Sequence, residues 1–436
     1  MYSCQSMGRR LGLTISFFFH VIRDLAGTLR IRLVRFWRRT ALGEEFLVVG
    51  VDVFPFFERM TGVGWYEWNL LAHLPAADPS LSVNLYAHAF GAPDEASPPA
   101  LPTSIRTRLR YHHIPEGFLL PVTPTLWVLR HLVEPVLMFL DGNDVFFAPN
   151  FFAPRRHLPA VRALVPTVHD LAFLRLPGTV QQETLNNLRR RLPGALFGAD
   201  ALIAVSDATA RDLTELTGTT ARRVHVIHEG VDPAFGRSAG PPPNGLPDRY
   251  LLFVSTLEPR KNLVGILEGF RRAVTVGYQG DLVLVGKWGW RAEAARLALA
   301  ASPVASRIHH LDYLDRAVLN TVLRRAEALL FPSFLEGFGL PVVEAMACGV
   351  PVIVSNATSL PEVAGEAGYY VDPHRPDSIA AAILQVGADP AERRLRVELG
   401  LARAARFRWE EAAAATAGVF RRAAGLGGRF PDAYRV

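Results

Sequence analysis

The chain has 436 residues, half of them hydrophobic and a fifth charged, a composition that excludes an intrinsically disordered protein and allows two domains. Its only cysteines, Cys4 and Cys348, lie far apart in sequence, which excludes a disulfide framework and a cysteine metal site. The formal net charge is +6, but residues 1–40 hold eight arginines against one aspartate, so the rest of the chain carries about −1 and is not a nucleic-acid binder.

The first segment, residues 1–40, mixes its arginines with apolar residues, among them the cluster from Ile15 to Phe19. An apolar, arginine-rich helix is suited to an anionic membrane surface. The cluster is shorter than the ~20 residues needed to span a bilayer, and no small-residue cleavage site of a secretory signal follows it. Two interpretations stay open: a peripheral anchor on the inner face of the plasma membrane, or an upstream extension without a function. In both, we expect a cytoplasmic protein.

From residue 45 onward, short apolar runs alternate with stretches of helical period, which predicts repeated βαβ units and a parallel sheet. In the first half we expect a loop with Gly62 and Gly64, followed by a helix over 65–74. The expected strands are 46–54, 82–88, 144–150, 165–170, 201–206 and 224–230. The proline-rich stretch 101–125 is interpreted as an irregular loop or insertion. The apolar stretch 126–140 is interpreted as a core helix, with a surface that faces an acceptor or a membrane as the alternative.

Clustered prolines and glycines between Phe235 and Asp248 predict a linker. The second half has expected strands at 250–256, 281–286, 328–333, 351–355 and 369–373. The sequence therefore predicts an α/β protein with two Rossmann-like doubly wound domains facing a central cleft, where ligands bind beyond the carboxyl ends of the strands. The expected boundaries are 41–235 for the N-terminal domain, 236–248 for the linker, 249–415 for the C-terminal domain, and 416–436 for a helix and tail.

The segment EGFGLPVVE, from Glu336 to Glu344, follows an expected strand. Gly337 and Gly339 permit close backbone approach and unusual dihedral angles, and Pro341 is suited to the start of a helix. Free amide groups at such a helix N-terminus can hold a diphosphate or a sugar hydroxyl. Two carboxylates beside the loop suit a sugar at one end and a ribose at the other. The alternative is that both are surface glutamates or glutamates that interact with the helix dipole.

The run from Pro332 to Pro373 resembles the donor domain of retaining glycosyltransferases of the GT-B fold, specifically the family-four group marked by E-x7-E. The resemblance covers most of the chain from about residue 45. It implies an acceptor-binding N-terminal domain and a C-terminal domain that binds the nucleotide sugar. It also implies that Glu336 acts on the donor sugar, and that the donor is bound by Gly337, Phe338, Gly339, Leu340 and Glu344.

The loop LEPRKN, residues 257–262, resembles the basic loop with which that family grips the donor diphosphate. Lys261 matches its lysine, whose charge would neutralise the leaving group. Many members carry a Gly-Arg pair after the preceding strand, where this chain has Ser255 and Thr256. The resemblance therefore leaves the second phosphate-binding cation open, with Arg260 as the substitute.

Two N-terminal motifs add to the resemblance. His169, at the end of an expected strand, matches the histidine that reaches across the cleft to the donor sugar. Gly62 and Gly64 resemble the glycine loop near the diphosphate and the acceptor, although a lone G-x-G is a weak motif. Ser206 is interpreted as a helix cap without a catalytic role.

The resemblance implies a hexosyltransferase that retains the anomeric configuration and extends a glycan or lipid-linked acceptor in surface polysaccharide or glycolipid synthesis. The combination of TLEPRKN with VHDLAF favours GDP-mannose as the donor substrate, with UDP-sugars next. No cofactor is expected, nor a metal, because no Asp-x-Asp occurs and the basic loop supplies positive charge. Asp312 and Glu362 are candidates for the nucleobase pocket. Another nucleotide-sugar enzyme, such as an epimerase or a phosphorylase, and an inactive membrane-bound scaffold remain as alternatives.

Overall fold

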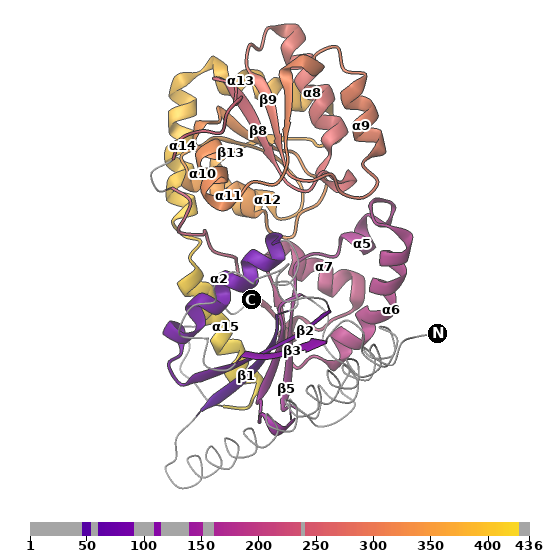
Figure 1. The fold of residues 1–436 in the computed structure, drawn as a ribbon, viewed down its shortest axis with the longest axis vertical. Helices are drawn as coiled ribbons and strands as arrows, with labels where there is room; N and C mark the ends of the chain where they lie inside the picture. The colour runs from indigo at the N-terminus through magenta and orange to yellow at the C-terminus, as the bar shows by residue number, and fades with distance from the viewer. Residues whose placement is uncertain are drawn as a thin grey trace, which may run out of the picture.

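The computed structural model describes residues 46–53, 60–90, 109–114, 139–150, 161–236 and 240–426. These residues form two lobes, each built around one parallel sheet (Figure 1). The expected leader at 1–40 and most of the stretch 126–140 lie outside the described residues. Within them, no helix combines the length and the apolar character needed to cross a membrane.

The N-terminal lobe has a seven-stranded sheet with the strand order β3-β2-β1-β4-β5-β6-β7. Its central strands are fully buried apolar runs, as expected of a parallel sheet covered on both faces. The strands are β1 (Leu47–Asp52), β2 (Leu81–Phe90), β3 (Leu109–Ile114), β4 (Val145–Ala148), β5 (Ala163–Val168), β6 (Leu202–Ala204) and β7 (Val224–Val226). The helices named in this lobe are α2 (Gly62–Ala77), α5 (Ala172–Arg175), α6 (Gln182–Gly198) and α7 (Asp207–Thr217).

The C-terminal lobe has a six-stranded sheet with the strand order β10-β9-β8-β11-β12-β13. Its strands are β8 (Tyr250–Val254), β9 (Asp281–Val285), β10 (Ile308–Leu311), β11 (Ala328–Phe331), β12 (Val352–Ser355) and β13 (Gly368–Val371). Its helices are α8 (Leu263–Val276), α9 (Glu293–Ala300), α10 (Arg316–Arg325), α11 (Leu340–Ala347), α12 (Leu360–Ala364), α13 (Pro376–Ala388) and α14 (Pro390–Ala404). The prediction of two doubly wound domains is confirmed.

Two strands were missed by the sequence prediction, and both lie at the edge of a sheet. β3 falls inside the stretch 101–125, so the interpretation of that stretch as irregular was wrong over Leu109–Ile114. β10 was not predicted at all. Their sequences, LRYHHI and IHHL, carry histidines and an arginine because an edge strand has one neighbour and needs no continuous apolar run. The prediction that Gly62 and Gly64 form a loop was also wrong, since both belong to the first turn of α2.

The last described helix, α15 (Trp409–Ala423), returns to the N-terminal lobe. Figure 1 shows this yellow helix beside α2, far from the C-terminal sheet that precedes it in sequence. The Phe420 ring packs 5.1 Å from the Phe147 ring, and Arg421 Nε donates to Asp78 Oδ2 over 2.7 Å. The chain therefore crosses twice between the lobes, which limits how far they can separate.

Candidate active site

The carboxyl ends of the two parallel sheets face each other, and their loops meet. The loop after β11 is packed so closely on the loop after β5 that a Cβ added to Gly337 would lie 1.7 Å from the carbonyl oxygen of His169. Thr209 Oγ1, from α7, lies 3.1 Å from the carbonyl oxygen of His169 and 3.3 Å from that of Gly337. A glycine is required at position 337 because the backbone of the other lobe occupies the space of a side chain.

The loop after β11 exposes a row of backbone donors. Gly339 has φ +113°, as a glycine can, and caps α11, with Pro341 in the first turn. Ser359 Oγ donates to the carbonyls of Glu336 and Phe338, which fixes the loop from behind. No described residue accepts a hydrogen bond from the amides of Gly337, Phe338, Gly339 and Leu340. Such a row at a helix N-terminus is suited to an anion or to sugar hydroxyls.

A second helix N-terminus approaches this loop from the other lobe. A Cβ added to Gly62, at the start of α2, would lie 4.0 Å from Leu340 Cδ1. The cap residue Thr61 forms no side-chain hydrogen bond, so the first amides of α2 are not used by a cap. Two positive helix ends therefore converge on one part of the cleft, an arrangement that suits an anion.

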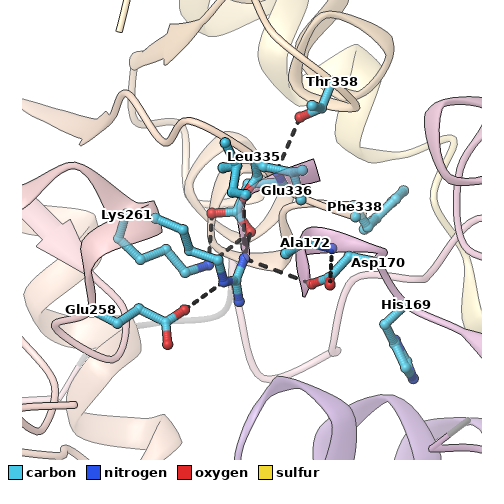
Figure 2. A network of polar contacts seen from close by, with 12 residues as sticks. His169, Asp170, Ala172, Glu258, Lys261, Leu335, Glu336, Phe338 and Thr358 are labelled. Atoms are coloured by element: carbon cyan, nitrogen blue, oxygen red, sulfur yellow. Dashed lines mark hydrogen bonds and ion pairs between the residues drawn. The ribbon is translucent and has the colours of Figure 1, made fainter. Parts of the chain in front are cut away.

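Lys261 and Glu336 form a buried ion pair at the centre of the site (Figure 2). Lys261 Nζ donates to both carboxylate oxygens of Glu336 over 2.6 and 2.7 Å. Both residues are 6–7 % exposed. Arg260 adds a 3.2 Å contact from Nη1 to Glu336 Oε2, while its Nε lies 2.6 Å from Glu258 Oε1. Asp170, across the cleft, lies 3.8 Å from Arg260 Nη1.

The backbone after β8 places these cations. Pro259–Lys261 form a single 3-10 turn, which ends at Asn262 with φ 62° in the left-handed region. The Asn262 side chain donates to the carbonyls of Pro332 and Pro373, so it ties this turn to two other strand ends of the same sheet. Asparagine tolerates that conformation better than most residues. The turn therefore aims Arg260 and Lys261 at the cleft.

Burial and charge act in opposite directions on this cluster. Burial disfavours the ionised form of Glu336, but Lys261 and Arg260 outweigh it and hold the pKa of Glu336 below its usual value. Burial, with the like charge of Arg260, lowers the pKa of Lys261. Burial raises the pKa of Glu258. The five side chains, Arg260, Lys261, Asp170, Glu258 and Glu336, comprise two cations and three carboxylates, so an anion that takes Lys261 as its partner leaves Glu336 in need of other donors.

His169 meets the C-terminal lobe through its backbone. Its Nε2 lies 2.8 Å from the carbonyl oxygen of Pro149, and its Nδ1 lies 3.3 Å from Glu229 Oε1. The Tyr66 ring packs edge-on at 4.8 Å. In Figure 2 the ring of His169 points away from Glu336. The structure therefore brings His169 to the cleft, with its ring held inside the N-terminal lobe.

Glu344 lies one turn into α11 and is buried, with 5 % exposure. Burial raises its pKa to about 7, although Arg316 beside it acts in the opposite direction. Arg316 Nη2 donates to Glu344 Oε1 over 3.0 Å. A carboxylate with this pKa changes its charge near neutral pH.

Two further predictions concern the surroundings of the site. Ser206 caps α7 by accepting from the Thr209 amide, as predicted. Glu362 accepts from the amides of Asp207 and Ala208 and pairs with His228 over 2.6 Å, so in this structure it joins the lobes. Asp207, His228 and Glu362 form the one described group whose spacing could hold a metal ion. The Glu362 carboxylate is already engaged by the amides of Asp207 and Ala208 and by the His228 ring. The expectation of metal independence stays a prediction.

The structure thus unites Lys261, Arg260 and Glu336 with the amides of the loop from Gly337 to Leu340, and places Gly62 beside that loop. Gly64 lies in the same turn of α2, and Glu344 faces Arg316. Asp170 and Glu258 were not predicted, although Asp170 adjoins His169 and Glu258 lies two residues before Arg260. Arg316, which no motif marks, was not predicted either.

Family models and a curated relative match most of the chain. Residues 60–235 match the model described as Glycosyltransferase Family 4, and residues 241–400 match that described as Glycosyl transferases group 1. The chain is 28% identical over 375 residues to the O-antigen chain mannosyltransferase B of Escherichia coli, covering 83% of this chain and 96% of that protein.

Two solved structures share the fold. A sucrose-phosphate synthase from Thermosynechococcus elongatus has a TM-score of 0.68 at 22% identity, covering 86% of this chain and 98% of that chain. Anabaena HepE, in complex with UDP and glucose, has a TM-score of 0.63 at 18% identity, covering 86% of this chain and 100% of that chain. Both superpose on the two lobes together, so the paired lobes and the cleft are common to all three proteins.

The raised pKa of Glu344 predicts a pH-dependent stability. Below the usual pKa of 4.5 the carboxyl is protonated in the folded and unfolded states. As the pH rises from 4.5 to 7, only the unfolded state ionises, so stability is lost across this window. Relative to Glu344→Gln, the wild-type free energy of unfolding should fall by up to about 3 kcal/mol between pH 4.5 and 7. Urea unfolding of both proteins across this range measures the difference, and parallel pH profiles would contradict the assignment.

Proposed function

Because the chain belongs to the glycosyl transferases group 1, a family of retaining GT-B enzymes, we propose that it transfers mannose from GDP-mannose to a glycan or lipid-linked acceptor. The process would be surface polysaccharide or glycolipid synthesis. The proposal of mannose rests on the similarity to the E. coli mannosyltransferase over most of both chains and on the motifs TLEPRKN and VHDLAF.

The observation that carries this proposal is the buried pair of Lys261 and Glu336 beside a row of unused amides. We propose that donor binding exchanges partners. Lys261 Nζ turns to the diphosphate, and the carboxylate of Glu336 accepts hydroxyls of the sugar instead. The exchange keeps both charges partnered, which matters because an unpaired buried charge is costly.

The leaving group gains negative charge as the bond from the anomeric carbon to the diphosphate oxygen breaks. Lys261 and Arg260 would neutralise that charge, and the amides of Gly337 to Leu340 with the first turn of α2, including Gly62 and Gly64, would hold the diphosphate. The acceptor oxygen forms its bond on the same face, and its proton passes to the departing phosphate oxygen. This accounts for retention without an enzyme nucleophile or a metal.

The remaining assignments follow from this arrangement. Glu344 would accept the ribose hydroxyls. His169 would contribute from the N-terminal lobe, through the carbonyl that already meets the loop and through its ring, which would have to turn from Pro149 and Glu229 toward a bound sugar.

The direct test incubates the purified full chain with GDP-mannose and a panel of UDP-sugars, with and without EDTA, and follows nucleotide release. We expect GDP release from GDP-mannose, unaffected by EDTA. Preference for a UDP-sugar would overturn the mannose assignment alone. Turnover that needs no glycosyl acceptor and yields an isomerised nucleotide sugar would indicate an epimerase, and use of phosphate as acceptor a phosphorylase. Failure of every nucleotide sugar to bind would overturn the proposal.

Lys261→Met separates catalysis from binding. The turnover number should fall about 10²–10³-fold, with a smaller change in the donor Michaelis constant, because leaving-group charge develops mainly in the transition state. Steady-state kinetics with the preferred donor measure both constants. Arg271→Met, which removes a partly exposed cation on α8, is the matched control and should leave both near wild type. A raised Michaelis constant with unchanged turnover would contradict the leaving-group role.

The basic leader is proposed to place the enzyme on an anionic membrane surface. Deleting residues 1–40 should abolish co-sedimentation with vesicles rich in phosphatidylglycerol and keep turnover on a soluble acceptor, because these residues precede the described lobes. Undiminished sedimentation, or loss of folding as judged by circular dichroism, would contradict the surface-anchor interpretation.

A further inference from the structure

Arg316 is the only hydrogen-bond partner that the described residues provide for the Glu344 carboxylate. It is the first residue of α10, after the cap Asp315. Its Nη2 donates to Glu344 Oε1 over 3.0 Å. Its Nε lies 2.8 Å from Asp232 Oδ2, in the segment that leads from the N-terminal lobe into the linker. One guanidinium therefore joins the proposed ribose carboxylate to the connection between the lobes.

Two aromatic rings hold the same guanidinium in place. Its central carbon lies 4.3 Å from the ring centre of Trp65 and 4.6 Å from that of Phe235. Trp65 is in the first turn of α2, in the N-terminal lobe, and Phe235 precedes the linker. Arginine stacks on aromatic faces while its planar fork still donates to carboxylates. Arg316 thus contacts both lobes and the chain that joins them.

The neighbours of Glu344 explain why such a partner is needed. Burial favours the neutral acid, and Asp232 and Glu229 act in the same direction, while Arg316 alone opposes them. A neutral carboxyl has lost one acceptor oxygen to its own proton, whereas an ionised carboxylate accepts from both hydroxyls of a diol. Since Arg316 donates a single hydrogen bond to Glu344 Oε1, the carboxylate keeps lone pairs for a ligand.

We infer that Arg316 is a positioning residue for the donor ribose. It holds the Glu344 carboxylate in place for the 2′,3′-diol, and its contact with Trp65 makes this positioning depend on the N-terminal lobe. The inference rests on the proposed function, in which Glu344 accepts the ribose hydroxyls. A purely structural role, in which Arg316 only joins the lobes, predicts equal effects on all nucleotides.

The test compares the affinities of the full chain for GDP and for 2′,3′-dideoxy-GDP by calorimetry. In the wild type, loss of the diol should weaken binding about tenfold or more, since hydrogen bonds to a charged group are removed. Arg316→Met keeps the apolar stem and removes the charge. It should weaken GDP binding to the level of the dideoxy ligand and leave dideoxy-GDP binding unchanged. Arg316→Lys should recover part of the preference for the diol.

Arg325→Met, an exposed arginine at the end of the same helix, is the matched control and should keep the wild-type ratio. If Arg316→Met is folded, as judged by circular dichroism, and keeps a tenfold preference for GDP, positioning by Arg316 is overturned. If Arg316→Met does not fold, a full wild-type preference for GDP in Arg316→Lys overturns the positioning role. A wild-type ratio near one would instead remove Glu344 from the ribose, which is a failure of the proposed function.

Trp65→Leu tests the contact between the lobes. Loss of the ring should reduce the preference for GDP over the dideoxy ligand, with Arg316 and Glu344 both present. An unchanged preference would overturn the dependence on the N-terminal lobe and leave positioning by Arg316 intact.

Discussion

Two buried charges of opposite sign, Lys261 and Glu336, meet where the carboxyl ends of the two sheets face each other. Neither charge is tolerable there without a partner, because removal from water costs more than an imperfect pair returns. Two side chains therefore hold the pair in place. Asn262 fixes the turn that carries Lys261, and Ser359 fixes the loop that carries Glu336. A donor that brings a diphosphate for Lys261 and hydroxyls for Glu336 can replace each charge's partner without leaving either exposed to an apolar interior.

Several contacts hold the two lobes together around this pair. Gly337 admits the backbone of His169, and Glu362 accepts from the first amides of α7. The return of α15 to α2 adds a second connection. Because Gly337 adjoins Glu336, one contact between the lobes and the site share the same loop.

The sequence predicted the parts of the fold that leave a local signature. The buried strands are continuous apolar runs, and the segment from Glu336 to Glu344 keeps its loop, glycines and helix start within nine residues. β3 and β10 left no such signature because edge strands carry polar residues. Lys261 and Glu336 were both predicted, each as a ligand for the donor, but their pairing was not, because it joins residues 75 positions apart. Arg316 lies 28 positions from Glu344 and belongs to no motif.

The exchange of partners can be observed directly. A crystal structure of the enzyme with a 2-fluoro nucleotide sugar, which transfers too slowly to turn over during crystallisation, would locate both charged groups with the donor in place. If donor binding exchanges the partners, Lys261 Nζ will lie on the diphosphate and the Glu336 carboxylate on the sugar hydroxyls, with a separation of the two well beyond the 2.6 Å of the donor-free pair. An intact pair with the sugar bound elsewhere would contradict it.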